Sequence, residues 1–232
     1  MSLVVATNSE TTEIARKCGV RRIDFLFDAG LAGSFRADVP KGEEQYSETL
    51  RLIWTGALIP RKALVLALDA VSLAKRRVSL TIVGADMGSI RPNEMILERG
   101  LEERVRWLGK VRWDEMIGHY ASSDCLLFTS LRDSLGAQIV EAAGLGLPII
   151  CLDHQGAAAF VTEEMGYRVP VSTPRETALR LAQAIDQLAQ LPPGARTRLS
   201  RSSLNRSRTV TWERHIEQMQ LFYQRALHNE TD

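Results

Sequence analysis

Short apolar runs alternate along this chain with longer segments in which apolar residues recur every three or four positions. The runs alternate little between apolar and polar residues, which is typical of parallel strands covered on both faces. The longer segments have the spacing of amphipathic helices. This order predicts a three-layer α/β domain with a mostly parallel sheet. The predicted strands include residues 23–27, 50–56, 78–84, 105–109 and 166–171, and the predicted helices include 63–74, 93–99, 113–120, 174–190 and 212–227.

The stretch 125–150 gives the clearest local prediction. Apolar runs at its two ends indicate buried strands, and the residues between them indicate a polar loop followed by a short helix. Gly136 lies where the loop must turn into the helix. In such a unit the helix N-terminus lies at the carboxyl end of the first strand, where free N–H groups and the helix dipole favour an anion. We therefore expect a phosphate-binding turn.

Two carboxylates bracket this turn. Asp133 lies in the loop and Glu141 lies eight residues further on, in the short helix. Carboxylates on either side of a phosphate site are suited to accept hydrogen bonds from sugar hydroxyls. The alternative is structural: Asp133 caps the helix, and Glu141 is a solvated helix residue.

Composition narrows the class of protein. The chain has 232 residues, 45% hydrophobic and 25% charged, which is ordinary for a soluble globular protein. A net charge of +1 gives no electrostatic case for nucleic acid or a membrane as partner. Three cysteines are too few for a disulfide framework, and the sequence shows no signal peptide and no apolar run of membrane-spanning length. We expect a cytoplasmic location.

An ordered series of residues resembles the nucleotide-sugar-binding half of retaining glycosyltransferases of the GT-B fold, family 4. In that family two Glu residues, separated by seven others, take the places of Asp133 and Glu141. The resemblance implies a Rossmann-like domain, one half of a GT-B fold, that binds a UDP-, GDP- or ADP-linked sugar as substrate and has no cofactor or metal. The matching residues are Gly56, Lys62, Gly84, Gly109, Asp133, Glu141, Gly146 and Pro148.

The resemblance also assigns roles. Glu141 would bind the ribose hydroxyls, Asp133 would face the transferred sugar, and Lys62 would reach the diphosphate. The turn from Leu108 to Val111 would meet the base. Catalytic roles thus fall to Lys62 and Asp133. The substrate-binding residues would be Gly56, Lys62, Gly109, Lys110, Asp133, Ser134, Leu135, Gly136, Ala137 and Glu141.

The chain departs from the family pattern at several positions, four of which bear on the site. Asp133 stands for a Glu, Ala57 stands where the family has an Arg that contacts the diphosphate, and Gln155 and Ala159 replace a Gly and a Glu. Losing one charge-assisted contact to a leaving diphosphate would remove about 2 to 4 kcal/mol of transition-state stabilisation. Arg61 and Arg132 are candidates to replace the missing Arg.

The expected organisation has three parts. Residues 1–50 would connect from a preceding domain, residues 51–190 would bind the nucleotide sugar, and residues 191–232 would form helices that pack back toward the missing N-terminal, acceptor-binding domain. Within the last part, the polar stretch 200–207 is expected to be a surface helix or loop. The isolated domain would be an inactive hexosyltransferase, and any membrane association would act through the missing domain.

Two other functions stay open. A nucleotide-sugar epimerase or hydrolase of related architecture would need an acid and base pair such as His154 with Asp133. A domain that binds nucleotide sugar without turnover, or serves only for interaction, is favoured by Ala57, Gln155 and Ala159. A Rossmann dehydrogenase is unfavoured, because no Gly-x-Gly-x-x-Gly follows the early strands.

Overall fold

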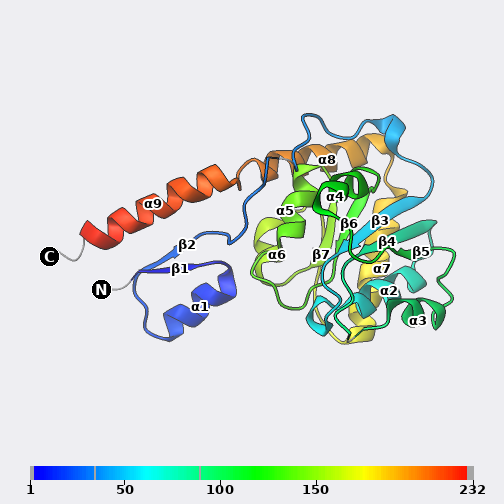
Figure 1. The fold of residues 1–232 in the computed structure, drawn as a ribbon, viewed down its shortest axis with the longest axis horizontal. Helices are drawn as coiled ribbons and strands as arrows, with labels where there is room; N and C mark the ends of the chain where they lie inside the picture. Colours follow the sequence, from blue (N-terminus) through cyan, green and yellow to red (C-terminus); the bar gives the residue numbers. More distant parts are fainter. Residues whose placement is uncertain (1–2, 34, 89, 229–232) are drawn as a thin grey trace.

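Six parallel strands form the main sheet of the protein, and the computed structural model describes residues 3–33, 35–88 and 90–228. The strand order is β5-β4-β3-β6-β7-β8 (Figure 1), so the chain moves outward from β3 on one side and from β6 on the other. The crevice between β3 and β6 is therefore a topological switch point, where ligands bind in open α/β sheets. The strands are β3 (Leu50–Thr55), β4 (Val78–Val83), β5 (Val105–Trp107), β6 (Cys125–Phe128), β7 (Ile149–Leu152) and β8 (Gly166–Val169).

Helices cover both faces of this sheet, as the apolar runs predicted. Leu52 and Trp54 of β3 belong to a core shared with α2, α3 and α7, whereas Ile53 belongs to the core shared with α4, α5 and α6. Successive strand residues thus enter opposite cores, which is why the strands lack a polar face. The first set is α2 (Leu64–Leu73), α3 (Pro92–Leu97) and α7 (Pro174–Gln190), and the second is α4 (Trp113–Ala121), α5 (Ala137–Gly144) and α6 (Gln155–Phe160).

A smaller unit precedes the main sheet. It consists of β1 (Val4–Ala6), α1 (Ser9–Lys17) and β2 (Ile23–Phe25), and its two strands pair only with each other among the described residues. The last helix, α9 (Trp212–His228), runs beside this unit and away from the six-stranded sheet (Figure 1). Arg225 of α9 forms an ion pair at 3.1 Å with Asp24 of β2. The two ends of the chain are therefore joined to each other.

Helix α8 (Pro193–Ser207) corrects one expectation. The polar stretch 200–207 was expected at the surface, yet Ser200 and Ser203 are fully buried. Helix α8 packs on α5, which carries small residues such as Ala142 and Ala143 on its buried side. Small serine side chains fit where two helices approach closely, and the Ser200 hydroxyl also accepts a hydrogen bond from the Lys41 backbone N–H at 3.1 Å.

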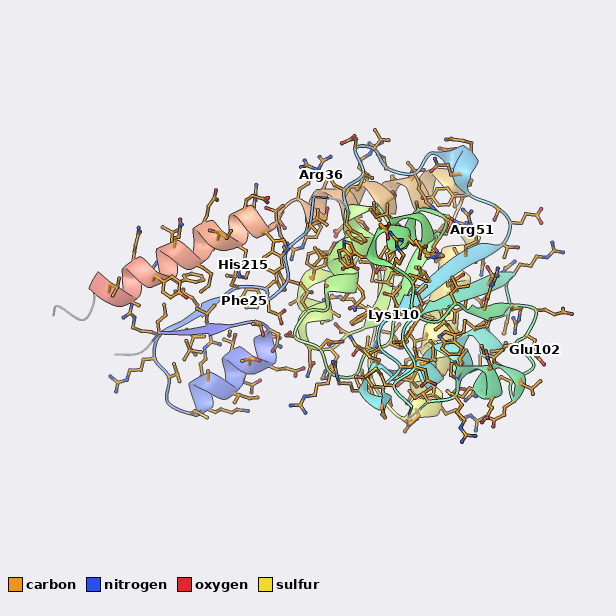
Figure 2. The ribbon with its side chains drawn as sticks, viewed as in Figure 1. Phe25, Arg36, Arg51, Glu102, Lys110 and His215 are labelled. Carbon is orange, nitrogen blue, oxygen red and sulfur yellow. The ribbon has the colours of Figure 1, made fainter. Side chains whose placement is uncertain are left out.

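The amino ends of the central strands are closed by an ionic cluster. Asp124, whose side chain is fully buried, binds the Arg51 guanidinium through both carboxylate oxygens at 2.6 and 2.9 Å. Lys41, in the connecting segment beside the short 3-10 turn η1 (Glu43–Gln45), lies 3.5 Å from the same carboxylate. Burial lowers the pKa of Lys41, and the Asp124 charge opposes that shift. This cluster, marked by Arg51 in Figure 2, fastens the connecting segment to the amino ends of the central strands.

All three cysteines are free thiols. Cys125 of β6 and Cys151 of β7 are buried in the sheet, whereas Cys18 follows α1 and is exposed. Burial raises the pKa of both sheet thiols, that of Cys151 to about 12.

Candidate functional site

The carboxyl ends of β3, β4 and β5 meet at three glycines. A methyl group on Gly84 would lie 1.8 Å from the carbonyl oxygen of Gly56, and the Gly84 N–H donates to the carbonyl of Gly109 at 2.9 Å. The backbones approach so closely here that no side chain fits at Gly84. Gly56 and Gly109, two of the predicted site residues, are thus held at one edge of the sheet.

Lys62 lies at the switch point, at the end of the 3-10 turn η2 (Pro60–Lys62) that follows β3. Its side chain is buried, and Nζ donates to Asp133 Oδ2 at 2.6 Å. Arg61, one residue earlier, donates from Nη1 to Asp133 Oδ1 at 2.7 Å. Lys62 and Asp133, the two predicted catalytic residues, are therefore in direct contact, and one carboxylate serves two cations.

Asp133 does not cap the helix. The N-cap of α5 is Gly136, at φ 94°, and no side chain makes a capping hydrogen bond there. Burial would raise the pKa of Asp133, but hydrogen bonds from Lys62, Ser130 and Arg61 outweigh burial and hold that pKa below its ordinary value. Asp133 is thus ionised at neutral pH, and the start of α5, with exposed Ala137, keeps backbone N–H groups that can face an anion.

Glu141 is half-buried and has a different set of partners. Its Oε2 accepts a hydrogen bond from the hydroxyl of Tyr120 at 3.0 Å, and that hydroxyl lies 3.1 Å from Thr55 Oγ1 at the end of β3. Burial raises the pKa of Glu141, and the Tyr120 hydrogen bond opposes that rise. Tyr120 itself is fully buried, and burial, followed by the Glu141 charge, raises its pKa well above the ordinary value. The arrangement fixes one carboxylate oxygen and leaves Oε1 to accept from a ligand.

Gln155, at the start of α6, reaches back to the loop. Its side-chain Oε1 accepts the Asp133 backbone N–H at 2.7 Å. The backbone of Gln155 has φ 50°, a left-handed conformation that favours glycine. The family resemblance places a Gly at this position, and Gln155 adopts the left-handed backbone there while its side chain supports the loop.

The smaller unit also contacts the loops of the site. Ser134 Oγ donates to the Asp28 carboxylate, and His154 Nδ1 lies 3.0 Å from Glu10 Oε1 of α1. His154 and Asp133, the acid and base pair of the epimerase or hydrolase hypothesis, thus have different partners. The structure gives that hypothesis no contact on which to build.

The structure brings some of the predicted residues together in two adjoining groups. Lys62, Asp133 and Gly56 form the first group. Glu141 forms the second group with Thr55, the residue before Gly56. Lys110 is exposed beyond β5, and Leu135 is buried under the loop. Sequence reasoning missed Tyr120 and Thr55, because a tyrosine in an amphipathic helix and a threonine in a strand give no local signal of their function. Within the described residues, no cluster of three or more His, Cys, Asp or Glu side chains could hold a metal ion.

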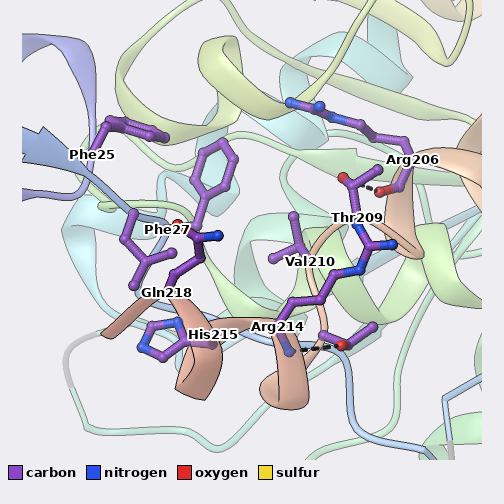
Figure 3. A pocket seen from close by; sticks show the side chains of 10 residues that line it. Phe25, Phe27, Arg206, Thr209, Val210, Arg214, His215 and Gln218 are labelled. Carbon is purple, nitrogen blue, oxygen red and sulfur yellow. Dashed lines mark hydrogen bonds between the residues drawn. The ribbon is translucent and has the colours of Figure 1, made fainter. Parts of the chain in front are cut away.

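A hollow of about 220 Å³ lies elsewhere, between β2 and the start of α9. Figure 2 labels Phe25 and His215 on its two sides. None of the predicted site residues lines it, so it is separate from the strand-end site. Figure 3 shows its lining side chains, which include Phe25, Phe27, Arg206, Thr209, Val210, Arg214, His215 and Gln218.

No helix in the described part of the chain combines the length and the apolar character needed to cross a bilayer.

Comparisons with known proteins place this geometry in a family. The model of the family described as glycosyl transferases group 1 matches residues 49–190. A D-inositol 3-phosphate glycosyltransferase of Corynebacterium glutamicum is 28% identical over 137 residues, which are 59% of this chain and 32% of that protein.

Solved structures share the fold. The pneumococcal O-GlcNAc transferase GtfA, in complex with UDP and GlcNAc, matches with a TM-score of 0.77 and 18% identity, over 97% of this chain and 45% of that one. Sucrose-phosphate synthase from Thermosynechococcus elongatus matches with a TM-score of 0.80 and 19% identity, over 98% and 59% of the two chains.

The chain thus spans about a third of the length of the curated relative and about half of each solved chain. The family match begins just before β3 and ends with α7, so it contains the whole six-stranded sheet. The predicted fold, a Rossmann-like half of a GT-B architecture, is confirmed. The chain belongs to the group 1 glycosyl transferases.

Proposed function

We propose that this chain is the donor-binding domain of a retaining family 4 glycosyltransferase, which moves a hexose-type sugar from a nucleoside diphosphate to an acceptor. One observation carries the proposal. A buried lysine and a half-buried glutamate flank a helix start without a side-chain cap, at the switch point of a parallel sheet. A lysine and a helix start can bind phosphate oxygens, and a carboxylate can accept hydrogen bonds from ribose and sugar hydroxyls. A nucleotide sugar needs these groups in one place.

The diphosphate is the central part of the proposed substrate. Lys62 Nζ and the backbone N–H groups from Ser134 to Ala137 would bind its oxygens. When the bond between the anomeric carbon and the β-phosphate oxygen breaks, negative charge grows on that oxygen. Positive groups that are already in place stabilise this charge without reorganisation. These positive groups belong to the protein itself, so the proposed mechanism is metal-independent.

Each of the two carboxylates would then contact a different sugar of the substrate. Glu141 Oε1 would accept hydrogen bonds from the ribose hydroxyls, while the Tyr120 hydroxyl holds Oε2. Asp133 would face the transferred hexose, next to the diphosphate. The acceptor hydroxyl would attack the anomeric carbon from the face that the diphosphate leaves and would pass its proton to the departing β-phosphate oxygen, so that the anomeric configuration is retained.

We also propose that an acceptor-binding domain completes the enzyme, because the chain spans 32% of its curated relative. The unit β1-α1-β2 and helix α9 expose apolar side chains, including Ile14, Phe25 and Ile216. A two-stranded sheet is marginally stable by itself, and a neighbouring domain would cover these side chains. Catalysis, the acceptor and any membrane association would depend on that domain.

Calorimetric titration with UDP, GDP and ADP tests the donor site. We expect the 232-residue chain to bind one of these in the micromolar to millimolar range. Lys62→Ala and Glu141→Ala should each weaken binding by about tenfold or more, because each removes a charge-assisted contact. Glu102→Ala is the matched control, since exposed Glu102 precedes β5 at the opposite edge of the sheet (Figure 2).

Failure of all three nucleotides to bind would contradict the proposal. So would binding that neither variant weakens, because the nucleotide would then occupy another part of the molecule. Circular dichroism of each variant shows whether a loss of binding reflects unfolding.

A domain that binds the nucleotide sugar without turnover is the second candidate. It is favoured by Ala57, which cannot supply the family cation, and by the carboxylate of Asp133, which neutralises charge beside Lys62. Both candidates bind the donor. Release of free nucleoside diphosphate from a nucleotide sugar, with the acceptor-binding domain present, would distinguish the enzyme from the binding domain.

A further inference from the structure

The turn that carries Arg61 and Lys62 is fixed to the carboxyl end of β6. Thr129 Oγ1 lies 3.0 Å from the carbonyl oxygens of both Lys62 and Ala63, and the Leu131 N–H donates to the Arg61 carbonyl at 2.8 Å. The indole of Trp54 in turn lies 3.0 Å from Thr129 Oγ1. These contacts join β3 and β6 across the switch point. The backbone of both cationic residues is therefore held in place before any ligand arrives.

The two cations share one counter-ion. Lys62 Nζ is 2.6 Å from one oxygen of Asp133, and Arg61 Nη1 is 2.7 Å from the other. Two positive charges and one negative charge leave an excess of one positive charge at the switch point. The Lys62 side chain is 8% exposed, whereas that of Arg61 is 47% exposed, so the guanidinium forms the outer side of the cluster. An anion entering from solvent reaches Arg61 first.

We propose that Arg61 is a second diphosphate-binding cation of this chain and that Asp133 is the internal counter-ion, which an incoming diphosphate replaces at both cations. This inference rests on the proposed donor site. It explains how the site functions although Ala57 supplies no charge: the second cation comes from the turn after β3, next to Lys62. Guanidinium matches phosphate oxygens in a forked geometry, which makes arginine well suited to this place.

A purely structural role for Arg61 predicts a different result. Arg61 Nη1 also donates to the carbonyl oxygen of Arg132 at 2.7 Å, so the side chain could serve only to hold the loop. In that case its removal would weaken folding and would affect UDP and UMP alike. A phosphate-binding role predicts a loss that is larger for UDP than for UMP, because only UDP has the β-phosphate.

The experiment is calorimetric titration of the 232-residue chain with UDP and UMP, and with GDP and GMP in parallel. We expect Arg61→Ala to weaken diphosphate binding about tenfold to a hundredfold, and monophosphate binding much less. Lys62→Ala should weaken diphosphate binding by a similar factor. Arg77→Ala removes an exposed guanidinium just before β4, at the amino ends of the strands and away from the site, and should change binding less than about threefold.

Asp133→Asn tests the counter-ion in the opposite direction. Removing the competing carboxylate frees both cations, so UDP should bind several-fold more tightly than to the wild-type chain. Weaker UDP binding would overturn the counter-ion role, because Asp133 would then support the diphosphate site and not compete with its ligand. Free UDP is the appropriate probe, since it lacks the sugar that Asp133 is proposed to face.

The outcomes separate the two proposals. If Lys62→Ala loses UDP while Arg61→Ala binds it as the wild type does, the inference about Arg61 fails and the donor site stands. Equal losses for UDP and UMP in Arg61→Ala overturn the inference in favour of the structural role. If the wild-type chain binds no nucleotide of either pair, the proposed function fails, and the inference fails with it.

Discussion

The two carboxylates beside the turn at α5 lie in opposite environments, although only seven residues separate them. Asp133 meets two cations, which lower its pKa in spite of burial. Within the described residues, the Glu141 side chain accepts from the hydroxyl of Tyr120, and burial raises its pKa. Lys62 and Arg61 therefore hold Asp133 as an anion, whereas burial disfavours the charged form of Glu141 and the Tyr120 hydrogen bond favours it.

This contrast shows how one loop and one helix can supply carboxylates suited to two different parts of a ligand. A carboxylate that is neutralised by cations resists protonation but competes with phosphate for those cations. A desolvated carboxylate without a cation gains from each hydroxyl that donates to it, as a ribose would. The residue type does not decide which role a carboxylate takes; the neighbours that the turn η2 and helix α4 supply decide it.

The largest effect is expected from breaking the ionic side. Lys62→Met should lower the free energy of unfolding by about 2 to 3 kcal/mol, because it leaves Asp133, 15% exposed, with only Arg61 as a charge partner. Urea denaturation measures this loss. Lys75→Met, at an exposed position, should stay within about 0.5 kcal/mol. If both variants lose the same small amount of unfolding free energy, the Lys62–Asp133 pair behaves as a surface ion pair, and the contrast between Asp133 and Glu141 is not supported.

Loss of the Tyr120 hydroxyl, which contacts Glu141, should lower stability less than loss of Lys62. Tyr120→Phe removes the hydrogen bonds to Glu141 and Thr55 and should cost about 1 to 2 kcal/mol of unfolding free energy. The pKa of Glu141 should rise further, because the lost hydrogen bond lowers it in the wild type. NMR titration of the Glu141 carboxyl checks the direction. Tyr223→Phe, at an exposed tyrosine, is the control; a Glu141 pKa that falls in Tyr120→Phe would refute the support role.

The pH dependence of stability should have opposite signs at the two carboxylates. Asp133 has a lowered native pKa, so its contribution is complete above about pH 4, the ordinary pKa of Asp, and is lost as pH falls through the native value. Glu141 has a raised native pKa, so its penalty is present at neutral pH and is relieved as pH falls through that value.

Urea denaturation from pH 7 to pH 3, compared with Asp133→Asn and Glu141→Gln, tests these signs. The stability of the wild type relative to Asp133→Asn should fall at the acid end, and its stability relative to Glu141→Gln should rise. Both changes should be about 1 kcal/mol or less, because both groups are partly solvated. Two curves of the same sign would show that the environments do not differ as described.

A comparably small effect concerns the support that Gln155 gives to the Asp133 backbone. Gln155→Ala leaves a non-glycine residue in the left-handed conformation and loses the hydrogen bond to the Asp133 N–H. It should therefore lower the free energy of unfolding by about 1 kcal/mol. Gln155→Gly loses the same hydrogen bond but relieves the backbone strain, and should lie closer to the wild type. Thermal unfolding ranks the three proteins. A glycine variant less stable than the alanine variant would contradict the strain argument.

Local patterns were enough to predict most of the fold. Residues 50–55 and 78–83 form strands because apolar side chains enter both cores, and Gly56 and Gly84 follow directly after those strands. The turn at Gly136 with Asp133 and Glu141 on its two sides could likewise be predicted from one short segment of sequence. The ends were less predictable: the strand expected over 166–171 ends at Val169.

Contacts between distant segments were not readable from the sequence. Tyr120 and Glu141 lie on different helices, and Thr55 joins them from a strand 65 residues before Tyr120. The burial of Ser200 follows from the packing of α8 on α5, which composition does not encode. The ionic partners of Asp133 could be suspected only because a family resemblance placed Lys62 beside the diphosphate.

The distribution of the cysteines makes the chain ready for site-specific labelling. A thiol reacts as its thiolate, so burial and a raised pKa protect Cys125 and Cys151, while Cys18 is open to solvent at the end of α1. A maleimide dye added to the native protein should therefore modify one position, on the smaller unit. Fluorescence from that dye would report where β1, α1 and β2 lie when the switch point of the main sheet is filled, without any cysteine having to be removed.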